Sequence, residues 1–105
     1  MSDALDRLFA TIAARKGADP ASSYTAKLLA EGVEKCAKKF GEEATETVIA
    51  AISRDKTELA KESADVLYHL FVLWAASGIT PAEVYAVLRA REGRSGLEEK
   101  AARTR

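Results

Sequence analysis

Two pairs of acidic side chains are the residues of this sequence best suited to chemistry. Glu43 and Glu46 are three residues apart, and so are Glu62 and Asp65. Residues three apart on an α-helix are neighbours, so each pair would present two carboxylates on one side of a helix. Residues 42–65 hold seven acidic and three basic side chains, a local charge of −4 in a chain whose formal net charge is zero. Partly desolvated carboxylates are unfavourable unless they are protonated, paired or bound to a metal.

The four carboxylates can converge if the helices that carry them pack antiparallel. These helices are consecutive and are joined by a tight turn near residue 54, which forces that packing. Glu46 then lies at a similar height to Glu62, and Glu43 opposes Asp65. Oxygen ligands without thiolate suit a hard cation, so the pattern predicts Mg²⁺, with Mn²⁺ as an alternative. Because Mg²⁺ usually shares its shell with substrate phosphates, the implied ligand is a nucleotide polyphosphate.

The same acidic pairs have a structural explanation. Most acidic pairs with this spacing are solvated helix faces, which stabilise no ligand. Under that interpretation the protein is a non-catalytic helical dimer or adaptor. Two pairs at matching height on adjacent helices favour the metal site more than either pair alone, but the spacing leaves both interpretations open.

Composition limits the class of protein. The chain has 105 residues and a mass of 11.3 kDa, which predicts one domain over residues 1–105 with a basic tail from about residue 91. A net charge of zero predicts neither a nucleic-acid nor an acidic-membrane partner. One cysteine cannot form an internal disulfide, and with one histidine it cannot build a thiolate and imidazole zinc site. The N-terminal segment lacks an apolar signal region, so we expect a cytoplasmic protein.

Periodicity and punctuation predict an all-α protein of four to five helices. The expected helices cover residues 3–15, 23–32, 33–53, 55–77 and 80 onward, and a last exposed turn or two could follow residue 95. An apolar stripe is expected on the 33–53 helix; its members are Val33, Cys36, Ala37, Phe40, Ala44, Val48 and Ile52.

The segment 66–76 is apolar nearly all round, which predicts a helix buried on more than one face. A unit of this size has few ways to surround such a helix. We therefore expect a second copy of the chain to cover part of it and complete the bundle as a homodimer.

Basic side chains and one histidine lie close to the acidic pairs in sequence. Lys38 and Lys39, one turn before Glu43, could meet phosphate oxygens or be solvated lysines. His69, one turn beyond Asp65, could support the metal ligands, although a satisfied core histidine is the more common case.

Other side chains have a structural role as their first explanation. Cys36 is expected to pack in the core. Core or dimer contacts, rather than a base-stacking platform, are expected for the aromatic residues Tyr68, Phe71 and Trp74. The arginines near the C-terminus could reach phosphates across a dimer or be solvated; these are Arg89, Arg91 and Arg94.

Nearly the whole chain resembles a known enzyme family. The runs EKCAKKFGEEATETVIAA and ELAKESADVLYHLFVLWAASGI resemble phosphoribosyl-ATP pyrophosphohydrolases, of the MazG-like all-α nucleotide pyrophosphohydrolase superfamily. Upstream, DPASSYTAKLLAEG is similar to the loop and short helix of the same enzymes, and TPAEVYAVLRAREGRSGLEEKAAR to their C-terminal end. ExxE followed by ExxD is the motif of the superfamily, and SSYTAKLL and KKFGEEATE point to the histidine-pathway branch.

The resemblance implies an all-α, usually dimeric enzyme that needs Mg²⁺. Its reaction would convert phosphoribosyl-ATP and water to phosphoribosyl-AMP and pyrophosphate, the second step of histidine biosynthesis, without a fused cyclohydrolase domain. A house-cleaning pyrophosphohydrolase of the same superfamily, acting on (d)NTPs, stays an alternative.

The resemblance also implies roles for particular residues. The four acids of the two pairs match the metal-ligand positions, and one glutamate, with Glu46 favoured over Glu43, would orient or deprotonate the attacking water. By analogy Ser22, Tyr24 and Thr25 would lie near substrate, or else cap and pack the short helix together with Ser23.

Overall fold

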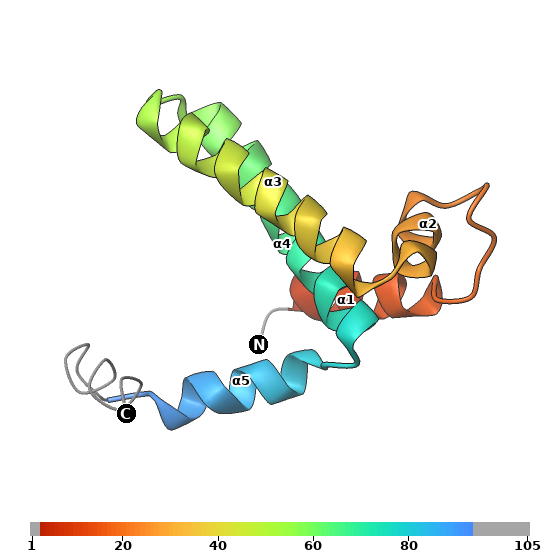
Figure 1. Cartoon of the computed structure of the whole chain (residues 1–105). Coiled ribbons are helices and arrows are strands. Elements are labelled where there is room, and N and C mark those ends of the chain that lie inside the picture. The colour runs from red at the N-terminus through yellow and green to blue at the C-terminus, as the bar shows by residue number, and fades with distance from the viewer. Residues whose placement is uncertain (1–2, 94–105) are drawn as a thin grey trace.

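The computed structural model describes residues 3–93, and these residues form five α-helices and no strand. The all-α fold predicted from the sequence is therefore confirmed (Figure 1). The predicted last turn after residue 95 and Arg94 lie outside the described residues. The helices are α1 (Asp3–Ala14), α2 (Tyr24–Glu31), α3 (Val33–Ile52), α4 (Lys56–Ser77) and α5 (Pro81–Ala90).

The helix ends are fixed by the capping residues that the sequence shows. The Asp55 side chain accepts a hydrogen bond from the Glu58 backbone N–H at 3.0 Å and begins α4. Gly78 ends α4 in the left-handed region, with φ of 77°. Thr80 and Glu83 form a reciprocal capping box at the start of α5. These local bonds explain why the boundaries follow from sequence alone.

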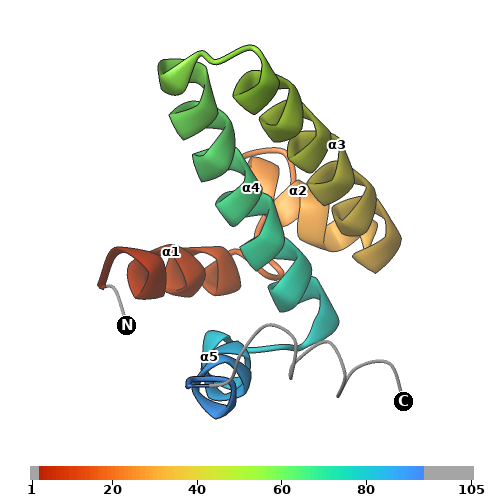
Figure 2. The same cartoon turned by 90° about the vertical axis from the view of Figure 1, so that its left-hand side faces the viewer.

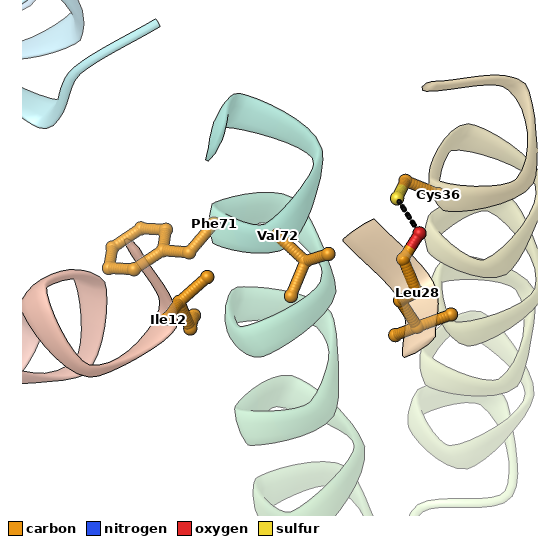
Figure 3. Close-up of a cluster of buried hydrophobic side chains, with 5 residues drawn as sticks. All are labelled: Ile12, Leu28, Cys36, Phe71 and Val72. Atoms are coloured by element: carbon orange, nitrogen blue, oxygen red, sulfur yellow. Dashed lines mark hydrogen bonds between the residues drawn. The ribbon is translucent and has the colours of Figure 1, made fainter. Parts of the chain in front are cut away.

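Helix α4 lies at the centre of the hydrophobic core. Ile12 of α1 and Phe71 point toward one another on one side of α4, while Val72 faces Leu28 of α2 and Cys36 of α3 on the other (Figure 3). All five side chains are at most 2% exposed. The prediction that this apolar helix is buried on more than one face is confirmed.

Helices α3 and α4 form an antiparallel hairpin that projects away from the other helices (Figures 1 and 2). Arg54 makes the tight turn with a left-handed φ of 64°, as the sequence predicted near this position. Helices α1, α2 and α5 gather around the opposite end of α4, and α5 turns away from α4 by 107°. Between residues 3 and 93, no single helix is long and apolar enough to cross a membrane, and α4 with α5 reaches that criterion only as this bent pair.

The apolar stripe predicted for α3 is only partly buried. Cys36 is 1% exposed, but Val48 is 56% and Ile52 75% exposed. Positions four apart advance about 40° around a helix, so the series from residue 36 to 52 rotates by about 160°. The residues that face α4 follow a different path: Thr47 donates to the Glu62 carbonyl, and Ala50 is 6% exposed. The predicted stripe was therefore wrong at Val48 and Ile52, and also at its first member, Val33, which is 46% exposed.

The core position of Leu28 predicts its contribution to stability. Leu28→Ala is expected to lower the free energy of unfolding by about 3 kcal/mol, because a side chain that is 1% exposed leaves a cavity. Leu88→Ala is the matched control: Leu88 is 52% exposed on α5, and its loss is expected to cost less than about 0.5 kcal/mol. Urea unfolding in metal-free buffer measures both, and equal losses would contradict this description of the core.

Candidate metal centre

Three carboxylates meet where α3 and α4 run side by side. One carboxylate oxygen each from Glu43, Glu62 and Asp65 lies within 4.8 Å of the other two. Glu43 comes from α3 and the other two from α4, so the antiparallel packing of the hairpin brings them together. Glu43 and Glu62 are half-buried and Asp65 is exposed. The cluster is thus open to solvent on one side, as a site that exchanges ligands requires.

The negative charge of the cluster is only partly compensated, because Lys39 interacts with Glu43 but forms its ion pair with Glu42. Glu62 Oε1 is shielded from solvent and has no hydrogen-bond partner among residues 3–93. Burial raises the pKa of Glu62, and the nearby carboxylates of Glu46, Asp65, Glu43 and Glu58 raise it further. Across residues 3–93, neither of the two ion pairs involves a carboxylate of the cluster. A buried carboxylate oxygen without a donor, beside two further carboxylates, fits a hard divalent cation.

Glu46 lies next to this cluster rather than in it. The structure brings three of the four predicted carboxylates together, and Glu46 is not one of the three. It lines a hollow of about 230 Å³ whose wall also includes Glu58 and Glu62. Glu46 stands about 60° around α3 from Glu43, and the hollow that it lines extends to Ser53, beside the turn of the hairpin. Glu62 is the residue common to the three-carboxylate cluster and the hollow.

His69 occupies the same stripe of α4, one turn beyond Asp65. It is 7% exposed, with its ring edge-on to Tyr68 at 4.9 Å and to Tyr24 at 6.3 Å between centroids. Its Nδ1 is buried without a hydrogen-bond partner in the described part of the chain. Burial lowers the pKa of His69, which favours the neutral imidazole. The prediction of a core histidine is confirmed by this burial, while the predicted satisfaction of its ring nitrogens is not met at Nδ1 within the described residues.

The loop and short helix before α3 use most of their hydroxyl groups internally. The Thr25 and Tyr68 hydroxyls hydrogen-bond each other, and the Ser22 hydroxyl donates to the Asp19 carbonyl. The Ser23 side chain caps α2 by accepting from the Ala26 N–H, as the packing alternative predicted. Tyr24 differs, because it is 52% exposed and its ring borders His69.

The basic residues expected near phosphate lie on α3 before the cluster. Lys38 is exposed, whereas Lys39 is half-buried and forms an ion pair with Glu42 at 3.1 Å. The hydrogen bond to Glu42 raises the pKa of Lys39. Arg89 and Arg91 are exposed at the C-terminal end of α5.

The structure assigns packing roles to Cys36 and to the aromatic residues of α4. The Cys36 thiol donates to the Leu28 carbonyl at 3.3 Å. Phe71 stacks on Trp74 with 4.7 Å between ring centroids, and Tyr68 packs against the same core. The prediction of core contacts for these residues is confirmed.

One residue beside the cluster was not identified from the sequence. Thr47 Oγ1 lies 2.9 Å from the Glu43 carbonyl oxygen and 3.2 Å from the Glu62 carbonyl oxygen. The available signal was its position four residues after Glu43, which places both residues on one face of the helix.

Comparison with known proteins agrees with this architecture. Residues 5–92 match the family model described as phosphoribosyl-ATP pyrophosphohydrolase. A phosphoribosyl-ATP pyrophosphatase of Parvibaculum lavamentivorans is 70% identical over 99 residues, which cover 94% of this chain and 91% of that protein. Proteins of the same name from Cereibacter sphaeroides (strain ATCC 17029) and Azospirillum brasilense are 66% and 62% identical over 94% of this chain, covering 96% and 89% of their own lengths. The chain therefore belongs to the phosphoribosyl-ATP pyrophosphohydrolase family.

Proposed function

We propose that this protein hydrolyses phosphoribosyl-ATP to phosphoribosyl-AMP and pyrophosphate, the second step of histidine biosynthesis, with Mg²⁺ or Mn²⁺ as cofactor. The observation that carries the proposal is the convergence of Glu43, Glu62 and Asp65 in a chain that matches the family over residues 5–92. A shielded oxygen of Glu62 that has no donor among the described residues supports the assignment, because a bound cation would satisfy it.

Each acid has a proposed role. Glu43, Glu62 and Asp65 would hold the cation. When bound, Mg²⁺ supplies charge neutralisation for the phosphates and lowers the pKa of water. Glu46 lies near enough to raise the pKa of Glu62 but outside the three-carboxylate cluster. We assign it either a further ligand position or the orientation and deprotonation of the attacking water, with Glu43 as the alternative base.

Substrate contacts are proposed on the α2 and Lys38 sides of the cluster. The exposed ring of Tyr24 offers contact area beside His69, and Ser22 and Thr25 flank it in sequence. The Thr25 hydroxyl is bonded to the Tyr68 hydroxyl, so it would contact substrate directly only if that hydrogen bond opened. Lys38 and Lys39 carry the positive charge that would meet phosphate oxygens.

Removing one carboxylate tests the site. Glu43→Gln and Asp65→Asn are each expected to reduce pyrophosphate release at least about 100-fold, because a cation ligand is lost. Without metal, both variants should melt at or above the wild-type temperature, since repulsion within the cluster is relieved. Glu34→Gln, on the first turn of the same helix, is the control and should leave turnover unchanged. A large loss of helicity in both cluster variants would argue against a catalytic role.

The substrate and cofactor are tested in one assay. Pyrophosphate release is measured with phosphoribosyl-ATP and with a panel of dNTPs, with Mg²⁺ and after EDTA treatment. We expect phosphoribosyl-ATP to be preferred, activity to vanish with EDTA, and Mg²⁺ to restore it and raise the melting temperature. Preference for dNTPs would favour the house-cleaning alternative. A protein that Mg²⁺ neither binds nor stabilises, and in which Glu43→Gln changes nothing, would be the helical adaptor.

The oligomeric state, the cellular location and the domain boundaries are also part of the proposal. We assign a homodimer, a cytoplasmic location and a single domain over residues 1–105. The outer side of α3 supports a dimer, because Val48, Ile49 and Ile52 are 56%, 61% and 75% exposed at the end of the hairpin that lies away from the core.

The oligomeric state gives a direct test. Light scattering after size exclusion is expected to report a dimer for the wild type and a monomer for Ile52→Glu, because a buried charge without a partner disrupts an apolar interface. Leu88→Glu is the control at a comparably exposed apolar position on α5, 52% exposed against 75% for Ile52. A wild-type monomer, or a dimer that Leu88→Glu disrupts and Ile52→Glu does not, would contradict the assigned surface.

A further inference from the structure

Thr47 joins the two helices that carry the acidic cluster. Its Oγ1 lies 2.9 Å from the carbonyl oxygen of Glu43 on its own helix and 3.2 Å from that of Glu62 on α4. Within residues 3–93, no other side-chain hydrogen bond connects α3 to α4. Both carbonyl groups belong to residues whose carboxylates lie in the three-carboxylate cluster.

The hydroxyl has one hydrogen, so it is shared between the two carbonyl oxygens or alternates between them. Each carbonyl lies inside a helix and has a second lone pair to accept it. Neither carbonyl therefore needs the Thr47 hydroxyl to have a hydrogen-bond partner. The effect of the hydroxyl is to hold the backbone of residue 62 at a fixed height beside the turn of α3 that begins at Glu43.

Packing alone constrains this part of the hairpin weakly. The core residues of α4, Phe71 and Val72, lie more than two turns from Glu62, farther from the turn of the hairpin. Near Thr47, Val48 and Ile49 point to solvent, and Ala50 is the one side chain of this stretch that is fully buried among the described residues. A small residue allows close approach but has little surface with which to fix the register.

We infer that Thr47 is a positioning residue, which sets the relative height of Glu43 and Glu62 through their backbones and thereby the affinity of the cluster for a divalent cation. Mg²⁺ demands near-ideal octahedral geometry, so a small change in register weakens its binding. Groups that orient metal ligands typically change affinity 10- to 100-fold when removed. This inference rests on the proposed function, because it assumes that the cluster holds the cation.

The test is cation affinity rather than activity alone. Mn²⁺ binding to the full chain is titrated by electron paramagnetic resonance of the free ion, and Mg²⁺ binding by the shift in melting temperature. Thr47→Val keeps the shape and removes the hydroxyl; we expect about 10-fold weaker Mn²⁺ binding. Thr47→Ser keeps a hydroxyl and should bind within about 3-fold of wild type.

Thr45 provides a matched control on the same helix. Its hydroxyl donates to the Gly41 carbonyl at 3.1 Å, the same bond within α3, but makes no bond to α4. Thr45→Val should therefore leave Mn²⁺ affinity unchanged. Equal affinity of Thr47→Val and wild type, or an equal loss in Thr45→Val, would overturn the role of Thr47.

A second pair of variants covers the case in which Thr47→Val folds poorly. Thr47→Ser and Thr47→Ala are both small and differ only in the hydroxyl. Several-fold tighter Mn²⁺ binding by the serine variant supports the inference, and equal binding overturns it. If the wild type itself binds no Mn²⁺, the proposed metal site fails and the inference fails with it, whereas wild-type binding with equal variants overturns only Thr47.

Discussion

The repulsion among three carboxylates in the partly buried cluster between α3 and α4 is the constraint that the rest of the structure has to balance. Glu43, Glu62 and Asp65 stand within 4.8 Å of one another, and no basic side chain of residues 3–93 forms an ion pair with them. Such a cluster costs stability in the folded protein because carboxylates repel one another and lose hydration. The remainder of the fold has to supply the stability that holds α3 and α4 together against this repulsion.

That stability comes from the opposite end of the hairpin. The buried side chains of α4, Phe71 and Val72, join α1 on one side and α2 and α3 on the other. Each large apolar side chain that is buried contributes about 1.5–3 kcal/mol to the free energy of unfolding. Within the part of the chain that the structure describes, the end of the hairpin near its turn lacks such buried side chains. The molecule thus separates a packed end, which keeps the helices together, from a polar end, where carboxylates remain accessible to ligand.

One stripe of α4 connects the two ends. Glu62, Asp65 and His69 follow at positions i, i+3 and i+7, and Val72 continues the stripe into the core. Two side-chain atoms on this stripe, Glu62 Oε1 and His69 Nδ1, are buried without a hydrogen-bond partner from residues 3–93. Each unsatisfied buried polar group lowers the free energy of unfolding by about 1–3 kcal/mol. Such groups are therefore found more often at functional sites than in parts of a protein that serve only packing. The acidic cluster and the border with Tyr24 are therefore two parts of the structure that stability alone does not explain.

The sequence by itself determined the elements and the chemistry of the acids. Helix ends depend on bonds between residues three or four apart, such as Asp55 with Glu58, and these are visible in the order of residues. Antiparallel packing followed from one tight turn, which placed Glu43 against Asp65. The tertiary structure decided which side of α3 meets α4, because the rotation of a helix depends on which small residues let its neighbour approach. It therefore buried Ala50 instead of Ile52, left Glu46 outside the cluster, and set the Thr47 hydroxyl between two backbone carbonyls.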